Sequence, residues 1–211
     1  MTTPFAQGLG KALAVIVLSE IGDKTFFIAA LMAMKRRRVD VFLGAWSALF
    51  AMTALSACAG TATARALSPT VTKRAATGLF FAFGARGVRD ALARGDDDDD
   101  ELREVEAELA GRRRKAKKKA TTPWATVAEA FAMTFLAEWG DRSQIATVGL
   151  AAQSDVAGVA LGGALGHAVC TGVAVIGGRQ LADRAANAER VVTGIGGCLF
   201  LLFGVHAALS G

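Results

Sequence analysis

The sequence predicts an all-α, polytopic membrane protein with six transmembrane helices in two inverted three-helix repeats. Three observations lead to this prediction. Apolar residues make up 53% of the 211-residue chain, and they gather in six long runs. A six-residue motif occurs twice, 118 positions apart. Lys and Arg are concentrated in alternate loops between the runs, which is typical of helices that cross a bilayer back and forth.

Each of the six runs is long enough to cross a bilayer, which takes roughly 20 apolar residues. They contain many Ala and Leu residues and do not alternate with period two, so helices are expected rather than strands. Helices also satisfy their own backbone hydrogen bonds in lipid. The runs lie at about 8–34, 41–64, 71–92, 123–152, 157–181 and 190–209.

The duplication divides the chain into three parts. Residues 1–93 form a first three-helix repeat, 94–122 a charged linker, and 123–211 a second three-helix repeat. The offset of 118 holds outside the motif as well, because it places Gly44 on Gly162. A unit of three spans reverses its direction when it is repeated, so the second repeat is predicted to be inverted.

The basic residues set the orientation. They are dense in the loops at 35–38, 112–119 and 179–190, which therefore face the cytosol and place both termini on the other side. The net charge of +5 is explained by these loops, and no nucleic-acid partner is expected.

The linker combines an acidic run, Asp96–Asp100, with apolar residues at helical spacing: Leu102, Val105 and Leu109. This pattern predicts a solvated, partly helical connector. A cytosolic cation sensor is the alternative, but the acidic run lacks the alternating ligands and the Gly of a calcium loop.

The repeated motif places charged residues in the middle of two apolar runs, about 12 and 15 residues from their starts. A charge at that depth costs about 2.5 kcal/mol or more, so such residues indicate a functional site. The first copy is Glu20-Ile21-Gly22-Asp23-Lys24-Thr25, and the second is Glu138-Trp139-Gly140-Asp141-Arg142-Ser143.

The motif residues predict a cation site. A Glu and an Asp three positions apart share one face of a helix, and two inverted copies meeting at mid-depth would bring four carboxylates together. Oxygen ligands select hard divalent cations, and protons compete for the same carboxylates, as cation/proton exchange requires. Gly22 and Gly140 allow the helices to open there. The predicted ligands are Glu20, Asp23, Thr25, Glu138, Asp141, Ser143 and Gln144, with Lys24 and Arg142 as charge partners.

Other interpretations remain open at this stage. The charges could form ion pairs within helices, which would leave both Asp residues unexplained. An exporter of basic amino acids or other cations, or a proton-independent channel, would use similar acids. No metalloprotease motif or nucleophile–base pair lies in the runs, so neither an enzyme nor a permanently bound cofactor is expected. His167, alone in a Gly-rich run, is interpreted as a hydrogen-bonded core residue, with a proton relay or a ligand as the alternative.

The two motifs resemble the signature E-x-G-D-[KR]-[ST] of the Golgi manganese/calcium–proton exchanger family, which also has chloroplast and bacterial members. In that family the signature occurs twice in a six-helix protein of two inverted halves. Residues 20–25 and 138–143 match it, and residues 166–179 look most like the Golgi-type eukaryotic branch.

The resemblance implies that the acids of both motifs carry transported Mn²⁺ or Ca²⁺, with H⁺ as the counter-ion. It also implies movement of the metal from the cytosol into an acidic lumen, or out of the cell. A Golgi membrane is the expected location, and a chloroplast or bacterial inner membrane the alternative. The sequence leaves the oligomeric state open, a homodimer being one option.

Overall fold

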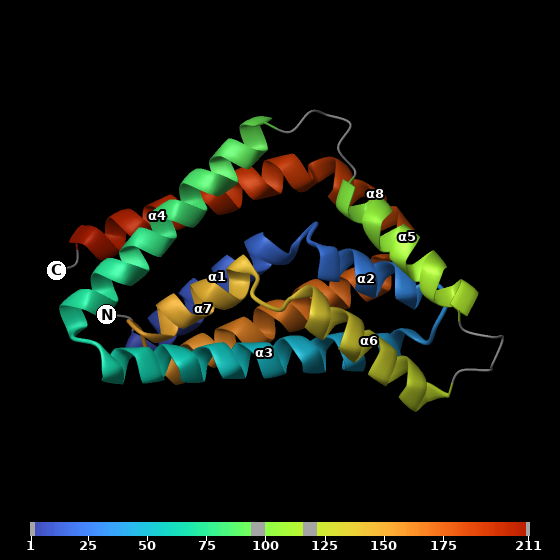
Figure 1. Ribbon diagram of the computed structural model, residues 1–211, viewed down its shortest axis with the longest axis horizontal. Coiled ribbons are helices and arrows are strands. Elements are labelled where there is room, and N and C mark those ends of the chain that lie inside the picture. The colour runs from blue at the N-terminus through green and yellow to red at the C-terminus, as the bar shows by residue number, and fades with distance from the viewer. Residues whose placement is uncertain (1–2, 94–99, 116–121, 210–211) are drawn as a thin grey trace.

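The computed structural model describes residues 3–93, 100–115 and 122–209, and every regular element in these ranges is an α-helix (Figure 1). The predicted all-α class is therefore confirmed. The helices are α1 (Pro4–Glu20), α2 (Lys24–Ala33), α3 (Arg38–Ala66), α4 (Pro69–Ala93), α5 (Asp100–Lys115), α6 (Pro123–Ala137), α7 (Arg142–Ala151) and α8 (Val156–Leu209).

The first and fourth apolar runs are each broken into two helices. Gly22 and Gly140 both have a φ of +83°, in the left-handed region that favours glycine, and the chain turns there. The expectation that Glu20 and Asp23 share one helix face is wrong, because α1 ends at Glu20 and Asp23 precedes α2.

Three helices in the described part of the chain are long and apolar enough to cross a membrane: Arg38–Ala66, Val156–Ala182 and Val191–Leu209. The last two belong to α8, which bends at Gly178, where φ is +53°. The third predicted span corresponds to α4, which carries several charges. The first predicted span is divided between α1 and α2, and the fourth between α6 and α7. The complete set of six spans stays a prediction.

Two packing contacts follow the 118-residue offset. Gly44 of α3 lies against Val127 of α6, and Gly162 of α8 lies against Leu9 of α1. Position 127 is the offset equivalent of position 9, so the same pair of positions meets twice with the two copies exchanged. Figure 1 shows α1–α2 and α6–α7 running in opposite directions, with α3 antiparallel to the first part of α8.

These contacts allow no side chain at the glycine. A Cβ on Gly162 would lie 2.3 Å from the backbone oxygen of Leu9, whereas a Cβ on Gly10 would meet nothing within 4 Å. We expect Gly162→Ala to lower the thermal unfolding temperature, because overpacking costs about 1–3 kcal/mol. Gly10→Ala should leave it unchanged or raise it slightly, since Ala is the better helix former. Equal unfolding temperatures for the two variants in detergent would contradict the close approach of α1 and α8.

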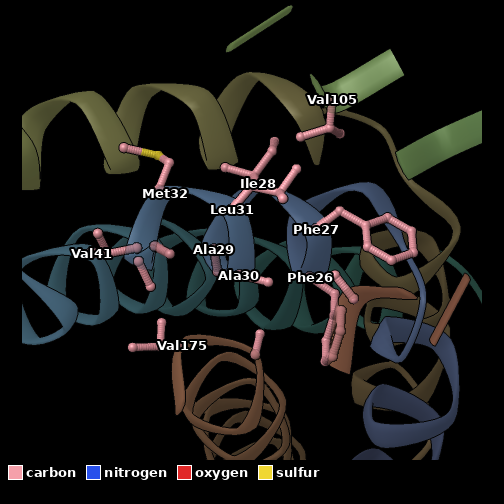
Figure 2. Packing of buried hydrophobic residues seen from close by; sticks show 14 of the residues in the cluster. Phe26, Phe27, Ile28, Ala29, Ala30, Leu31, Met32, Val41, Val105 and Val175 are labelled. Carbon is pink, nitrogen blue, oxygen red and sulfur yellow. The ribbon is translucent and has the colours of Figure 1, made fainter. Parts of the chain in front are cut away.

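The linker helix α5 packs onto α2. Val105 is fully buried, and Figure 2 shows it lying over Ile28 and Phe27 of α2. Leu102 is also buried, so the predicted helical spacing is confirmed, but the helix is docked on its apolar side rather than solvated all round. The acidic residues before Asp100 lie outside the described residues.

Candidate cation site

The two motifs fold into the same turn. In the first, the backbone N–H of Asp23 donates to the carbonyl of Glu20 at 3.2 Å. In the second, the N–H of Asp141 donates to the carbonyl of Glu138 at 3.0 Å. Each Glu thus stands at the end of one helix, and each Asp is the N-cap of the next.

Both breaks lie near the middle of the molecule in Figure 1. The carbonyl ends of α1 and α6 carry the negative pole of the helix dipole, which attracts cations. The N-terminal ends of α2 and α7 stabilise the carboxylates that precede them. A broken helix therefore supplies two oriented sets of backbone dipoles next to the buried carboxylates.

Carboxylates from both motifs converge at the breaks. Glu20 and Glu138 are each 2% exposed. One oxygen of each of these residues and one of Asp141 all lie within 4.8 Å of one another, a spacing that could hold a metal ion. Asp23, the fourth predicted carboxylate, lines one cavity together with Asp141.

The hydroxyl of Thr25 connects the two motifs, and that of Ser143 lies beside the Glu of its own motif. The Oγ1 of Thr25 lies 2.9 Å from Oε1 of Glu138 and 3.2 Å from Oε2 of Glu20, so it can donate to either carboxylate. Ser143 lies in the equivalent place, with its Oγ 3.5 Å from Oε2 of Glu138. Both hydroxyls are buried beside the carboxylates, as the sequence predicted.

Gln144 borders the site, because it lines a small cavity together with Glu138 and Ser143. Its Oε1 accepts a hydrogen bond from the backbone N–H of Gly140 at 2.9 Å, and its Nε2 faces the sulfur of Met52 at 3.6 Å. In this structure its amide oxygen holds the second motif turn in shape.

The basic residue of each motif was predicted to offset the carboxylate charge. Lys24 donates to Glu104 of the linker helix α5 at 2.6 Å, and both side chains are partly exposed. Arg142 begins α7, but its side chain lies outside the described residues. The pairing of Lys24 joins the motif directly to the linker. A second ion pair, between Arg179 of α8 and Glu106, fastens the same helix.

A cavity of about 480 Å³ reaches the site and is bordered by Asp23 and Asp141. Its other side is lined by Arg86 and Asp90 of α4, which pair at 3.4 Å. These two residues were not among the predicted site residues. Their signal was present, since they are opposite charges four positions apart inside the apolar run at 71–92.

His167 of α8 also lies in the site. Its side chain is 4% exposed, and its Nδ1 is 3.7 Å from Oε2 of Glu20. That separation is too long for a hydrogen bond, and Nδ1 has no hydrogen-bond partner in the described part of the chain. The expectation of a hydrogen-bonded core histidine is wrong for this atom.

Comparison with known protein families gives a match that covers both motifs. The family model described as "Divalent cation/proton antiporter GDT1" matches residues 8–95 and 126–211. The chain belongs to the GDT1 family. Each matched stretch contains one motif, and α5 lies between the two stretches.

Relatives in the GDT1 family match along nearly the whole chain. GDT1-like protein 5 of Arabidopsis thaliana is 42% identical over 97% of this chain and 96% of its own length. GDT1-like protein 5 of Oryza sativa subsp. japonica is 44% identical over 100% of this chain and 98% of its own length. GDT1-like protein 3 of Arabidopsis thaliana is 43% identical over 95% of this chain and 70% of its own length. No solved structure matches the chain.

Membership of the GDT1 family agrees with the prediction that the protein is a transporter rather than an enzyme. Together with the long apolar helices, it makes the protein an integral membrane protein in contact with the lipid bilayer, with cations and protons as its substrates.

Proposed function

We propose that the protein exchanges Mn²⁺ or Ca²⁺ for protons by alternating access at the paired motifs. The observation that carries this proposal is the convergence of Glu20, Glu138 and Asp141, whose oxygens lie within 4.8 Å of one another. The metal would move from the cytosol into an acidic lumen, or out of the cell. A Golgi membrane is the proposed location, with a chloroplast or bacterial inner membrane as the alternative.

The burial of these carboxylates supports exchange rather than simple binding. Ionised carboxylates removed from water need a compensating charge nearby. A divalent cation supplies two positive charges, and protonation removes negative charge. Either the bound cation or protonation compensates the negative charge of the carboxylates. The two exclude each other, because a protonated oxygen is a poor metal ligand. A carrier whose site always holds either the divalent cation or protons exchanges the cation for protons.

The donor atoms support Mn²⁺ and Ca²⁺ as substrates. Carboxylates and the hydroxyls of Thr25 and Ser143 are hard oxygen donors, which suit Mg²⁺, Ca²⁺ and Mn²⁺. Mg²⁺ gives up its water reluctantly and demands near-ideal octahedral geometry. Side chains at the ends of four helices meet the flexible coordination of Ca²⁺ more readily than the strict octahedral geometry of Mg²⁺.

The inverted-repeat architecture proposed for the chain would provide alternating access. Its support is the exchanged contact pair at Gly44 and Gly162 and the opposite directions of the two broken helices. Two halves of one design can rock about a site at their interface, opening it to either side in turn. The cavity beside Asp23 and Asp141 would be one of the two access routes.

Proton-coupled uptake is the direct test. We expect proteoliposomes with an acidic interior to accumulate Mn²⁺ or Ca²⁺ against its gradient, because outward proton flow drives the exchange. Uptake should fall to the level of protein-free liposomes when an ionophore removes the pH difference. Uptake that is insensitive to the pH difference would indicate a channel, and proton efflux driven by external lysine but by neither metal would indicate an amino-acid exporter.

A further inference from the structure

His167 places an imidazole beside the motif carboxylates, with its Nδ1 3.7 Å from Oε2 of Glu20. It is buried in α8, and its Nδ1 lacks a hydrogen-bond partner in the described ranges. Buried polar atoms in proteins are almost always hydrogen-bonded, so this unpaired nitrogen points to a ligand.

The distance between Nδ1 of His167 and Oε2 of Glu20 fits two ligands of one ion. Metal–ligand bonds of about 2.1 Å place neighbouring ligand atoms roughly 3.0 Å apart and opposite ones roughly 4.2 Å apart. The observed 3.7 Å lies between these limits and beyond hydrogen-bond distance.

A second buried polar atom faces the same place. A narrow cavity of about 10 Å³ is lined by His167, Glu138 and Ser56, and the Oγ of Ser56 also lacks a hydrogen-bond partner within the described residues. His167 therefore borders both motif glutamates: Glu20 at a short distance and Glu138 across this cavity.

The two halves differ at this position. The residue 118 positions before His167 is Leu49, which is buried and lines the same small cavity. The carboxylates and hydroxyls come in matched pairs from the two motifs, whereas the imidazole has an apolar counterpart. The repeated motif thus supplies the oxygen ligands twice, and α8 adds a single nitrogen on the side of Glu20.

We propose that His167 is a ligand of the transported cation and selects Mn²⁺ over Ca²⁺, an inference that rests on the proposed function. Ca²⁺ takes oxygen ligands, whereas first-row transition-metal ions bind imidazole nitrogen as well. Histidine is the commonest protein ligand of such metals. One nitrogen among several carboxylates raises affinity for Mn²⁺ while contributing little to Ca²⁺.

A spectroscopic experiment tests the ligand directly. Full-length protein in detergent is loaded with Mn²⁺ alone and examined by pulsed electron paramagnetic resonance. The wild type should show the ¹⁴N modulation of a coordinated imidazole. His167→Gln should bind Mn²⁺ without it, and His206→Gln, which changes an exposed histidine near the chain end, should retain it. Bound Mn²⁺ without ¹⁴N modulation in the wild type would overturn the proposal and leave the carboxylate site intact.

Uptake measurements test selectivity. In proteoliposomes with an acidic interior, His167→Gln should lower Mn²⁺ uptake by roughly tenfold or more, since metal sites lose about 10–100-fold when even a supporting residue is removed. Its Ca²⁺ uptake should stay within roughly threefold of the wild type, a change of less than one kcal/mol. His167→Leu, which copies Leu49, should shift the ratio in the same direction.

An equal loss of both metals, or no change in either, would overturn the selectivity assignment, because a structural role affects both ions alike. Failure of the proposed function is distinguishable from these results. In that case the wild type itself would transport neither metal in response to the pH difference.

Discussion

Glu138→Gln is expected to abolish proton-coupled metal uptake. Glu138 is buried, accepts from Thr25, and has an oxygen within 4.8 Å of both Glu20 and Asp141. Glutamine keeps the shape of the side chain but carries no charge and no proton to exchange. We expect uptake of Mn²⁺ and Ca²⁺ to fall by at least about 100-fold, because changes to residues that merely support a metal ligand already cost about 10–100-fold.

Glu129→Gln is the matched control. Glu129 lies on the same helix, α6, and pairs with Arg36 at 3.5 Å, away from the motif turns. The substitution removes the same charge from a partly exposed ion pair, which contributes about 0–1 kcal/mol. Uptake should therefore remain near the wild-type rate. Normal uptake by folded Glu138→Gln protein, judged by its thermal unfolding, would remove Glu138 from the ligand set. Glu20→Gln should behave as Glu138→Gln does.

The motif pairing was predictable because duplication is visible in the sequence itself. Two copies of an acidic motif inside apolar runs must avoid lipid, so both are expected to face the interior of the helix bundle, where they meet. The structure brings Glu20 and Glu138 together as expected. The meeting of the two motifs could be predicted without knowing the backbone conformation between the Glu and the Asp of each motif.

The break in the helices was harder to predict. A Gly inside an apolar helix is compatible with continuation, and the choice between a helical φ and the observed +83° depends on what surrounds the turn. At Gly22 and Gly140, the buried carboxylates on one side and the N-caps on the other favour the turn. A shared helix face for the Glu and Asp of a motif requires a continuous helix, which the chain does not form there.

The partners of Lys24 and His167 could not be predicted, because each partner lies far away in the sequence. Lys24 meets Glu104, 80 positions away, only because α5 docks on α2. The spacing of Leu102 and Val105 predicted the helix but gave no docking surface. His167 faces Glu20 because α8 packs along α1, a contact made by small residues that carry little pattern of their own.

The second large effect is expected at Gly140. A Cβ there would meet nothing within 4 Å, so a substitution changes only the backbone preference. Valine at a φ of +83° is a severe outlier, whereas asparagine adopts the left-handed region more readily than most residues. Gly140→Val should therefore distort the turn that positions Glu138 and Asp141.

We expect Gly140→Val to lower metal uptake by roughly tenfold or more, because backbone strain of this kind costs about 1–3 kcal/mol. Gly140→Asn should retain most of the activity. Gly78→Val is the control for β-branching alone, since Gly78 lies within α4 and its Cβ would also meet open space. If Val and Asn at position 140 support equal uptake, the turn does not depend on its left-handed conformation. If Val alone fails while the protein still unfolds at the wild-type temperature, the strain acts on the site. That result would show that the glycine serves transport by holding two carboxylates at the junction of two helices.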